Sequence, residues 1–197
     1  MQMKGPSFEL VMPDWIDEFL PTPDRVYPTM VERMELAIEL ARLNVKHGSG
    51  GPFGAALFDM ETDRLISAGV NLVASLGCSV FHAEIVAITL GQIKVGSYDL
   101  GGHGIPPMEL VSSTEPCAMC FGSLPWSGIR RLVCGARDGD ARGIGFDEGP
   151  KLSSWVSALE GRDIEVVRDI CRDESVAVLR KYMEDGGLIY NSRQGNI

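Results

Sequence analysis

The chain has 197 residues, consistent with one domain plus extensions, and 45% of them are hydrophobic, enough for a sizeable buried core. Its 18 Lys and Arg stand against 27 Asp and Glu, so the net charge of −9 gives no general attraction to nucleic-acid phosphates. No apolar stretch is long enough to cross a bilayer and no signal-peptide pattern is seen, so we expect no membrane partner. The odd number of cysteines, 5, indicates reduced thiols and predicts a cytoplasmic protein.

Residues 1–28 are predicted to form an N-terminal arm, because five of the 11 prolines lie there and exclude a long helix. Its apolar residues between 15 and 20 are expected to pack on the surface of the domain. That domain, over 29–187, begins with a helix over 29–47, since Thr29 and Glu32 form a capping-box pattern.

The glycine-rich stretch 50–54 leads into the first strand. Small residues there let a ligand or another backbone approach closely. Phe53 is either a core residue, which its spacing favours, or a ring on which a flat base stacks. Asn71, just past the second strand, has the character of a turn former.

Strands alternate with helices along the rest of the chain. We expect helices over 82–95, 116–125, 151–160 and 173–185, strands over 65–70, 108–113, 131–136 and 164–167, and an exposed acidic loop over 138–150. Pro125 should kink or stop its helix. The alternation predicts a three-layer α/β/α sandwich with a five-stranded mixed sheet.

The patterns H-x-E at 82–84 and P-C-x-x-C at 116–120 carry the chemistry. His82, Cys117 and Cys120 make three zinc ligands, and a catalytic zinc site leaves its fourth position to water. Glu84 is placed to move protons for that water without being a ligand. A lone C-x-x-C also fits a redox pair or a structural zinc, but a structural zinc needs a fourth ligand. The full combination is the signature of zinc deaminases.

At these residues the chain resembles the cytidine-deaminase-like superfamily, and within it the bacterial guanine deaminases, a subgroup linked to guanine and amino-triazine deamination. The likeness covers roughly residues 29 to 193. Besides the zinc signature, it rests on Gly51-Pro52-Phe53-Gly54-Ala55, Asn71, Trp126, the loop 144–150 and the tail Ile189-Tyr190-Asn191. Two departures are Pro125, where a helix-continuing residue is usual, and the bulky Val80-Phe81 before the histidine.

The resemblance implies a role for each residue at the site. Zinc would be held by His82, Cys117 and Cys120, and Glu84 would shuttle protons. It would place Phe53 against the base, Asn71 and the Ala83 backbone on the ring, and Trp126 in the pocket wall. Glu148 would be a second carboxylate that helps to protonate the departing amine, although Asp147 beside it is an alternative.

The reaction implied is hydrolytic deamination of a free base, guanine to xanthine and ammonia, or of an amino-triazine such as ammeline. A cytosine, nucleoside or tRNA-adenosine deaminase and an inactive zinc-binding protein are the alternatives. The acidic charge weighs against tRNA and Glu84 against inactivity. The resemblance also implies a homodimer in which the C-terminal tail, 188–197, covers the site of the partner subunit.

Overall fold

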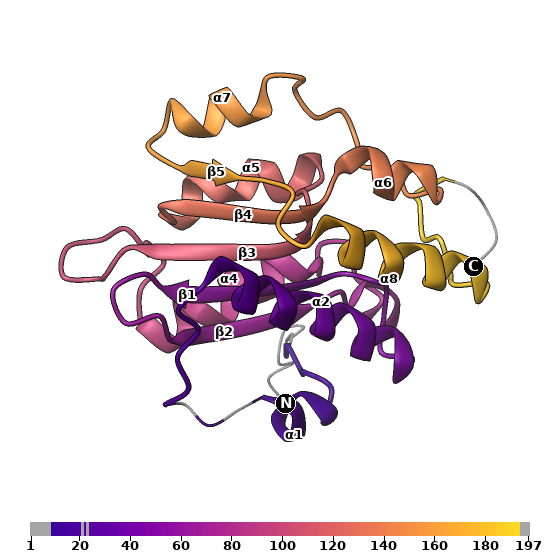
Figure 1. Ribbon diagram of the computed structural model, residues 1–197, viewed down its shortest axis with the longest axis horizontal. Coiled ribbons are helices and arrows are strands. Elements are labelled where there is room, and N and C mark those ends of the chain that lie inside the picture. Colours follow the sequence, from indigo (N-terminus) through magenta and orange to yellow (C-terminus); the bar gives the residue numbers. More distant parts are fainter. Residues whose placement is uncertain (1–8, 21, 23, 194–197) are drawn as a thin grey trace, which may run out of the picture.

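The computed structural model describes residues 9–20, 22 and 24–193, arranged around one sheet (Figure 1). The strands are β1 (Gly54–Asp59), β2 (Leu65–Val70), β3 (Met108–Thr114), β4 (Arg131–Ala136) and β5 (Glu165–Val167). The helices are α1 (Trp15–Phe19), α2 (Met30–Lys46), α3 (Val73–Leu76), α4 (Ala83–Val95), α5 (Ala118–Ser127), α6 (Asp138–Gly143), α7 (Trp155–Glu160) and α8 (Arg172–Glu184).

The strand order is β2-β1-β3-β4-β5, which confirms the predicted five-stranded mixed sheet. β1 runs antiparallel to β2, to which a short turn joins it, and also antiparallel to β3. β3, β4 and β5 are parallel to one another and are joined through helices. Gly54 pairs with Val70, and Thr114 with Ala136. The start of β1 and the ends of β2, β3 and β4 therefore meet at one edge of the sheet, called the site edge below.

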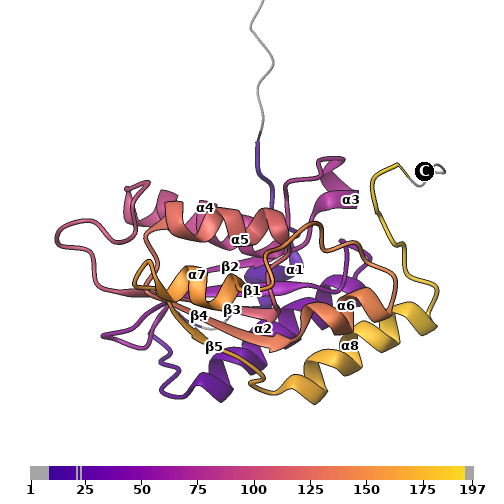
Figure 2. The same cartoon turned by 90° about the horizontal axis from the view of Figure 1, so that it is seen from above.

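Helices cover both faces of the sheet, with α4 and α5 on one face and α2 and α8 on the other (Figure 2). β1 and β3 are buried along their whole length, as expected for central strands with a helical layer on each side. One core cluster joins the sheet to α4, α5 and α7, and a second joins it to α2. This is the predicted three-layer sandwich. None of the described helices is long and apolar enough to cross a membrane.

Several local predictions are corrected. The expected loop over 138–150 begins with α6, whose start is capped because the Arg137 N–H donates to Asp140 at 2.8 Å. The helix expected from residue 151 begins only at Trp155, and the short helices α1 and α3 had no clear periodicity. α5 continues past Pro125 to Ser127. The proline lies so near the helix end that its missing N–H removes only one late hydrogen bond.

The described part of the segment before α2 packs on the rest of the chain. Trp15 donates its indole N–H to the Ser49 hydroxyl at 2.9 Å and stacks on His47, with ring centroids 5.4 Å apart. Ile16 is buried. The arm is thereby attached next to the glycine-rich turn that precedes β1. Residues 1–8, 21 and 23 of the predicted arm, and 194–197 of the predicted tail, lie outside the described residues.

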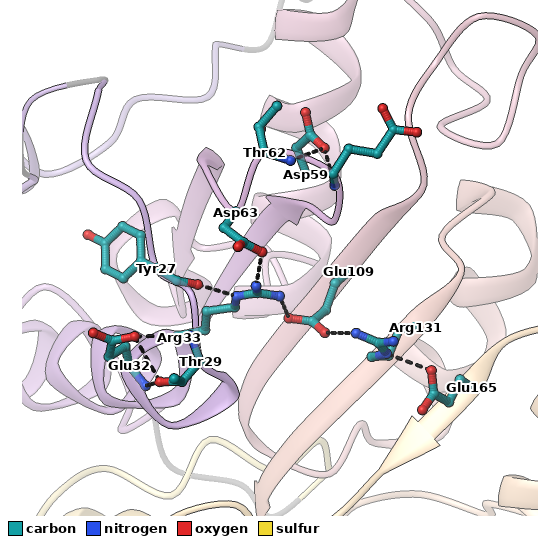
Figure 3. A network of polar contacts seen from close by, with 11 residues as sticks. Tyr27, Thr29, Glu32, Arg33, Asp59, Thr62, Asp63, Glu109, Arg131 and Glu165 are labelled. Carbon is teal, nitrogen blue, oxygen red and sulfur yellow. Dashed lines mark hydrogen bonds and ion pairs between the residues drawn. The ribbon is translucent and has the colours of Figure 1, made fainter.

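A buried ion network holds α2 to the sheet (Figure 3). The fully buried Glu109 of β3 accepts from Arg33 of α2 at 2.8 Å and from Arg131 of β4 at 3.0 Å. Arg131 continues to Glu165 of β5 at 2.6 Å, and Arg33 also pairs with Asp63. This network lies near the start of β3, at the opposite end of that strand from the site edge. It therefore supports the scaffold rather than the chemistry.

Candidate active site

The predicted zinc ligands converge at the site edge. His82 is the N-cap of α4, Cys117 is the N-cap of α5, and Cys120 lies one turn further along α5. Their ligand atoms all lie within 4.8 Å of one another, and Cys117 Sγ is 3.5 Å from His82 Nδ1. The meeting follows from topology, because α4 follows β2 and α5 follows β3. Two positive helix ends therefore face the ligands, where they favour thiolate.

A hydrogen bond in which Cys120 donates its proton to Cys117 couples the two thiols. A hydrogen bond from Cys120 holds the pKa of Cys117 at about 4, and the same bond raises the pKa of Cys120 well above its ordinary value. A cation that displaces this proton would gain a second thiolate ligand. Among the described residues, these three form the group of Cys, His, Asp and Glu side chains close enough to hold one ion. Two thiols and one imidazole fit zinc, with an open fourth position of the catalytic kind.

Three buried carboxylates line the same cavity, which has a volume of about 790 Å³. Glu115 is paired with Arg168, which leaves Glu84 and Glu148 for the chemistry. Burial raises the pKa of Glu84, at the start of α4, to about 7. Burial also raises the pKa of Glu148, in the loop after α6, to about 8. Asp147, left as an alternative by the sequence, has a side chain 63% exposed. Glu148 is therefore the second carboxylate that the fold encloses, while Asp147 lies at the rim.

Phe53 and Asn71 lie side by side at the site edge because the Asn71 N–H donates to the Phe53 carbonyl at 3.1 Å. Both line the cavity. Phe53 also packs edge-on against Phe146 at 5.0 Å, so it combines the core and cavity positions that the sequence offered as alternatives. Asn71 Oδ1 accepts from Val73 N at 3.3 Å, while its buried Nδ2 has no protein partner. Ala83, with its side chain in the core, stands between His82 and Glu84.

Trp126 does not line this cavity. Its side chain lies on the outer face of α5 and is 84% exposed, beside Phe121 and Leu152 at a separate shallow hollow. At roughly 3.6 residues per turn, nine residues carry the helix about half a turn past Cys117, so the ring faces away from the metal. The departures at Pro125 and Phe81 also lie outside the cavity lining, and Phe81 packs against the core on the α2 side.

The tail folds back over the site of its own chain. Gly186, with φ of +74°, turns the backbone after α8. Tyr190 then packs on Phe146 at 5.1 Å and on Gly51, where a Cβ would lie only 2.6 Å from its hydroxyl. Asn191 donates to the Gly145 carbonyl and accepts from the Asp147 N–H, each at 2.8 Å. The tail can therefore cover the site without a partner subunit, and its exchange between subunits stays a prediction.

Sequence reasoning missed several residues around the cavity. Thr114 and Glu115 line it at the end of β3, and Phe146 lines it from the loop after α6. Glu115 lies directly before Pro116, so the motif itself could have flagged it. Phe146 lies in the loop 144–150 that carried the resemblance, but no role was predicted for it.

We expect one zinc ion per chain, held by His82, Cys117 and Cys120. Among the described residues, no fourth Cys, His, Asp or Glu is grouped with these three ligands. Elemental analysis of the purified protein measures the stoichiometry, and X-ray absorption counts the sulfur and nitrogen neighbours. A ratio near zero, or a fourth protein ligand, contradicts this prediction.

Comparison with known proteins agrees with this geometry. Residues 29–136 match the cytidine and deoxycytidylate deaminase zinc-binding region. The guanine deaminase of Bacillus subtilis is 33% identical over 115 residues, 58% of this chain and 69% of that protein. The solved guanine deaminase of Nitrosomonas europaea is 42% identical with a TM-score of 0.87, covering 93% of this chain and 100% of that one.

A further solved structure, a mutant complex with 8-azaguanine, is 43% identical with a TM-score of 0.86 and covers 90% of this chain and 98% of that one. Other relatives include tRNA-specific adenosine deaminases and a probable cytosine deaminase. The family match covers more than half of the chain and contains all three metal ligands. The chain belongs to the cytidine and deoxycytidylate deaminase family, and it is a zinc-dependent deaminase.

Proposed function

We propose that the protein deaminates free guanine to xanthine and ammonia, with amino-triazines such as ammeline as further candidate substrates. The observation that carries this proposal is Glu148, a buried carboxylate in the same cavity as Glu84 that has no arginine partner of the kind that Glu115 has in Arg168. Guanine presents N–H donors at N1 and at the C2 amine, which a carboxylate can accept. The similarity to two guanine deaminases supports the same substrate.

The base is held by side chains from both sides of the site edge. Phe53 supplies an aromatic face, and the unpartnered Nδ2 of Asn71 supplies a donor for a carbonyl or ring nitrogen. The Ala83 backbone at the start of α4 is a further candidate partner. Tyr190 closes the cavity from the tail, and its buried hydroxyl has no protein partner. These buried polar groups have lost their hydrogen bonds to water, and a bound base that pairs with them would supply new hydrogen bonds.

Glu84 and Glu148 carry out different proton transfers. Zinc, when bound, lowers the pKa of water and so supplies a nucleophile at neutral pH. Glu84, beside the ligands, takes a proton from the attacking water and delivers it to a ring nitrogen. Burial raises the pKa of Glu148 to about 8, so this group can also carry a proton to the amine and improve it as a leaving group.

We expect Glu148→Gln to impair guanine deamination severely, while Asp147→Asn, a matched neutral change at the rim, leaves it nearly intact. A donor left unpaired in the closed site costs about 1–3 kcal/mol, and the lost proton transfer adds to this. Ammonia release is measured on guanine, ammeline, cytosine, cytidine and guanosine, with a tRNA arm for adenosine deamination. A wild-type preference for cytidine, guanosine or tRNA contradicts the free-base proposal. Loss of activity in Asp147→Asn alone assigns the role to Asp147.

Deletion of the residues after Gly187 is expected to raise KM and lower kcat, because it removes Tyr190 from the cavity and exposes the site to water. Steady-state kinetics on guanine measures both constants. Asn191→Ala, which removes the hydrogen bonds to Gly145 and Asp147 and keeps Tyr190 in the chain, should give a smaller change in the same direction. A fully active truncated protein shows that the tail has no role in closure.

We also expect a homodimer, and the exposed face of α5 is the candidate contact. Trp126 is 84% exposed and Leu152 57% exposed, and together with the edge of Met119 they leave apolar surface uncovered. Light scattering gives the mass of the wild type, and Trp126→Glu should shift it towards the monomer. A monomeric wild type contradicts the prediction.

A further inference from the structure

Lys151 is a buried cation that the proposed chemistry leaves without a function. It lies in the segment between Glu148 and α7, and its side chain is only 6% exposed. Its ammonium group donates to the Pro116 carbonyl at 2.8 Å and pairs with Asp138 at 3.1 Å. The Glu115 carboxylate lies 3.9 Å away, and the ring of Trp155 lies below at 4.8 Å. A lysine is seldom so enclosed unless every N–H has a partner.

The contact with Pro116 joins the loop of the second carboxylate to the turn of a zinc ligand. Pro116 directly precedes Cys117, and Ala118 directly follows it. Ala118 donates its N–H to the Glu148 carbonyl at 2.8 Å. The two segments are therefore connected on both sides of Cys117, by a backbone hydrogen bond on one side and by Lys151 on the other.

The peptide between these two connections is tightly confined. Arg142 donates to the Gly149 carbonyl at 2.8 Å. Gly149 has φ of +69°, and a Cβ there would lie 3.0 Å from the Ala118 side chain. The loop thus lies almost directly on the start of α5, so a shift of Lys151 changes the distance between Glu148 and the metal ligands.

The charge of Lys151 is matched to its surroundings. Glu115 accepts from Arg168 at 2.6 Å and Asp138 from Arg142 at 2.7 Å, so each carboxylate has a second cation. Lys151 lies between these two pairs. A neutral residue of the same length would leave the Pro116 carbonyl without its donor and would remove one shared counter-charge from both carboxylates.

We propose that Lys151 is a positioning residue, which holds Glu148 at a set distance from the zinc-ligand turn by bonding the Pro116 carbonyl. This inference rests on the proposed function, because Glu148 acts in that reaction. Lys151 touches neither substrate nor metal in this assignment, and it acts through the loop alone. Phe53 and Asn71, which hold the base, belong to other segments and keep their places when Lys151 is changed.

Lys151→Met keeps an unbranched chain as long as the four-carbon stem of lysine and removes the ammonium group. In the zinc-loaded enzyme we expect kcat for guanine to fall about 10–100-fold, the usual effect of removing a group that orients a metal site. KM should change by less than about threefold, and the zinc content should stay at one per chain. Lys181→Met, at an exposed helical pair with Asp185, is the matched control and should behave as wild type.

A double-mutant cycle separates positioning from general destabilisation. If Lys151 acts through Glu148, Lys151→Met made in a Glu148→Gln background should lower kcat less than about threefold further. Multiplicative effects overturn the inference, as does an unchanged kcat in the single variant. If Lys151→Met does not fold, Lys151→Gln carries the same cycle.

The proposed function is tested separately, by the activity of the wild-type protein on guanine. A wild type without guanine deaminase activity refutes that function and not the position of Lys151. In that case a crystal structure of the zinc-loaded Lys151→Met protein decides, since a displaced Glu148 loop supports the inference and an unmoved loop overturns it.

Discussion

Glu84→Gln is expected to keep the fold and the zinc while losing about 10²–10⁴-fold in kcat. The change keeps the size of the side chain and removes its ability to carry a proton. Glu84 is buried at the start of α4, two residues from a metal ligand, and it lines the cavity with Glu148. No other described carboxylate occupies an equivalent place on α4, so the lost step has no substitute there.

Zinc content, thermal unfolding and steady-state rate on guanine together test this expectation. Glu61→Gln, in the exposed turn between β1 and β2, is the matched control and should leave all three unchanged. A Glu84→Gln protein that keeps more than about a tenth of the wild-type rate shows that the proton is carried by another group. Loss of zinc in this variant would mean that Glu84 is a ligand rather than a shuttle.

Removal of zinc is expected to abolish turnover and to lower the melting temperature. An ion that binds only the native state adds about 2.7 kcal/mol when its free concentration is 100 times its Kd. For a chain of this size that corresponds to roughly 5–10 °C in Tm.

Dialysis against a chelator, followed by addition of zinc, measures both effects, and readdition should restore the rate and the melting temperature. Cys117→Ala should behave as the apoprotein and should not respond to zinc. Cys171→Ser, at a cysteine outside the cavity, is the control and should respond as wild type. An active apoprotein contradicts the assignment of a metal-dependent reaction.

The carboxylate next to the metal and the second carboxylate differ in how far the sequence could place them. Glu84 follows His82 within one helix start, so local spacing alone puts it beside the ligand. Glu148 lies in a loop far from both motifs, and local pattern could not separate it from Asp147. Contacts between distant segments, among them the hydrogen bond from Ala118 to the Glu148 carbonyl, hold Glu148 inside the cavity and leave Asp147 at the rim.

The sequence by itself predicted the zinc ligands, the carboxylate beside them, the strands and main helices, and the layered fold, because these depend on spacing and periodicity over a few turns. Tertiary structure decided what long-range packing controls. It folded Tyr190 over the cavity of its own chain and brought Lys151 onto the Pro116 carbonyl. Each of these contacts joins segments that are distant in the sequence. The register of the sheet and the direction of the helices bring them together, and neighbouring residues do not reveal either feature.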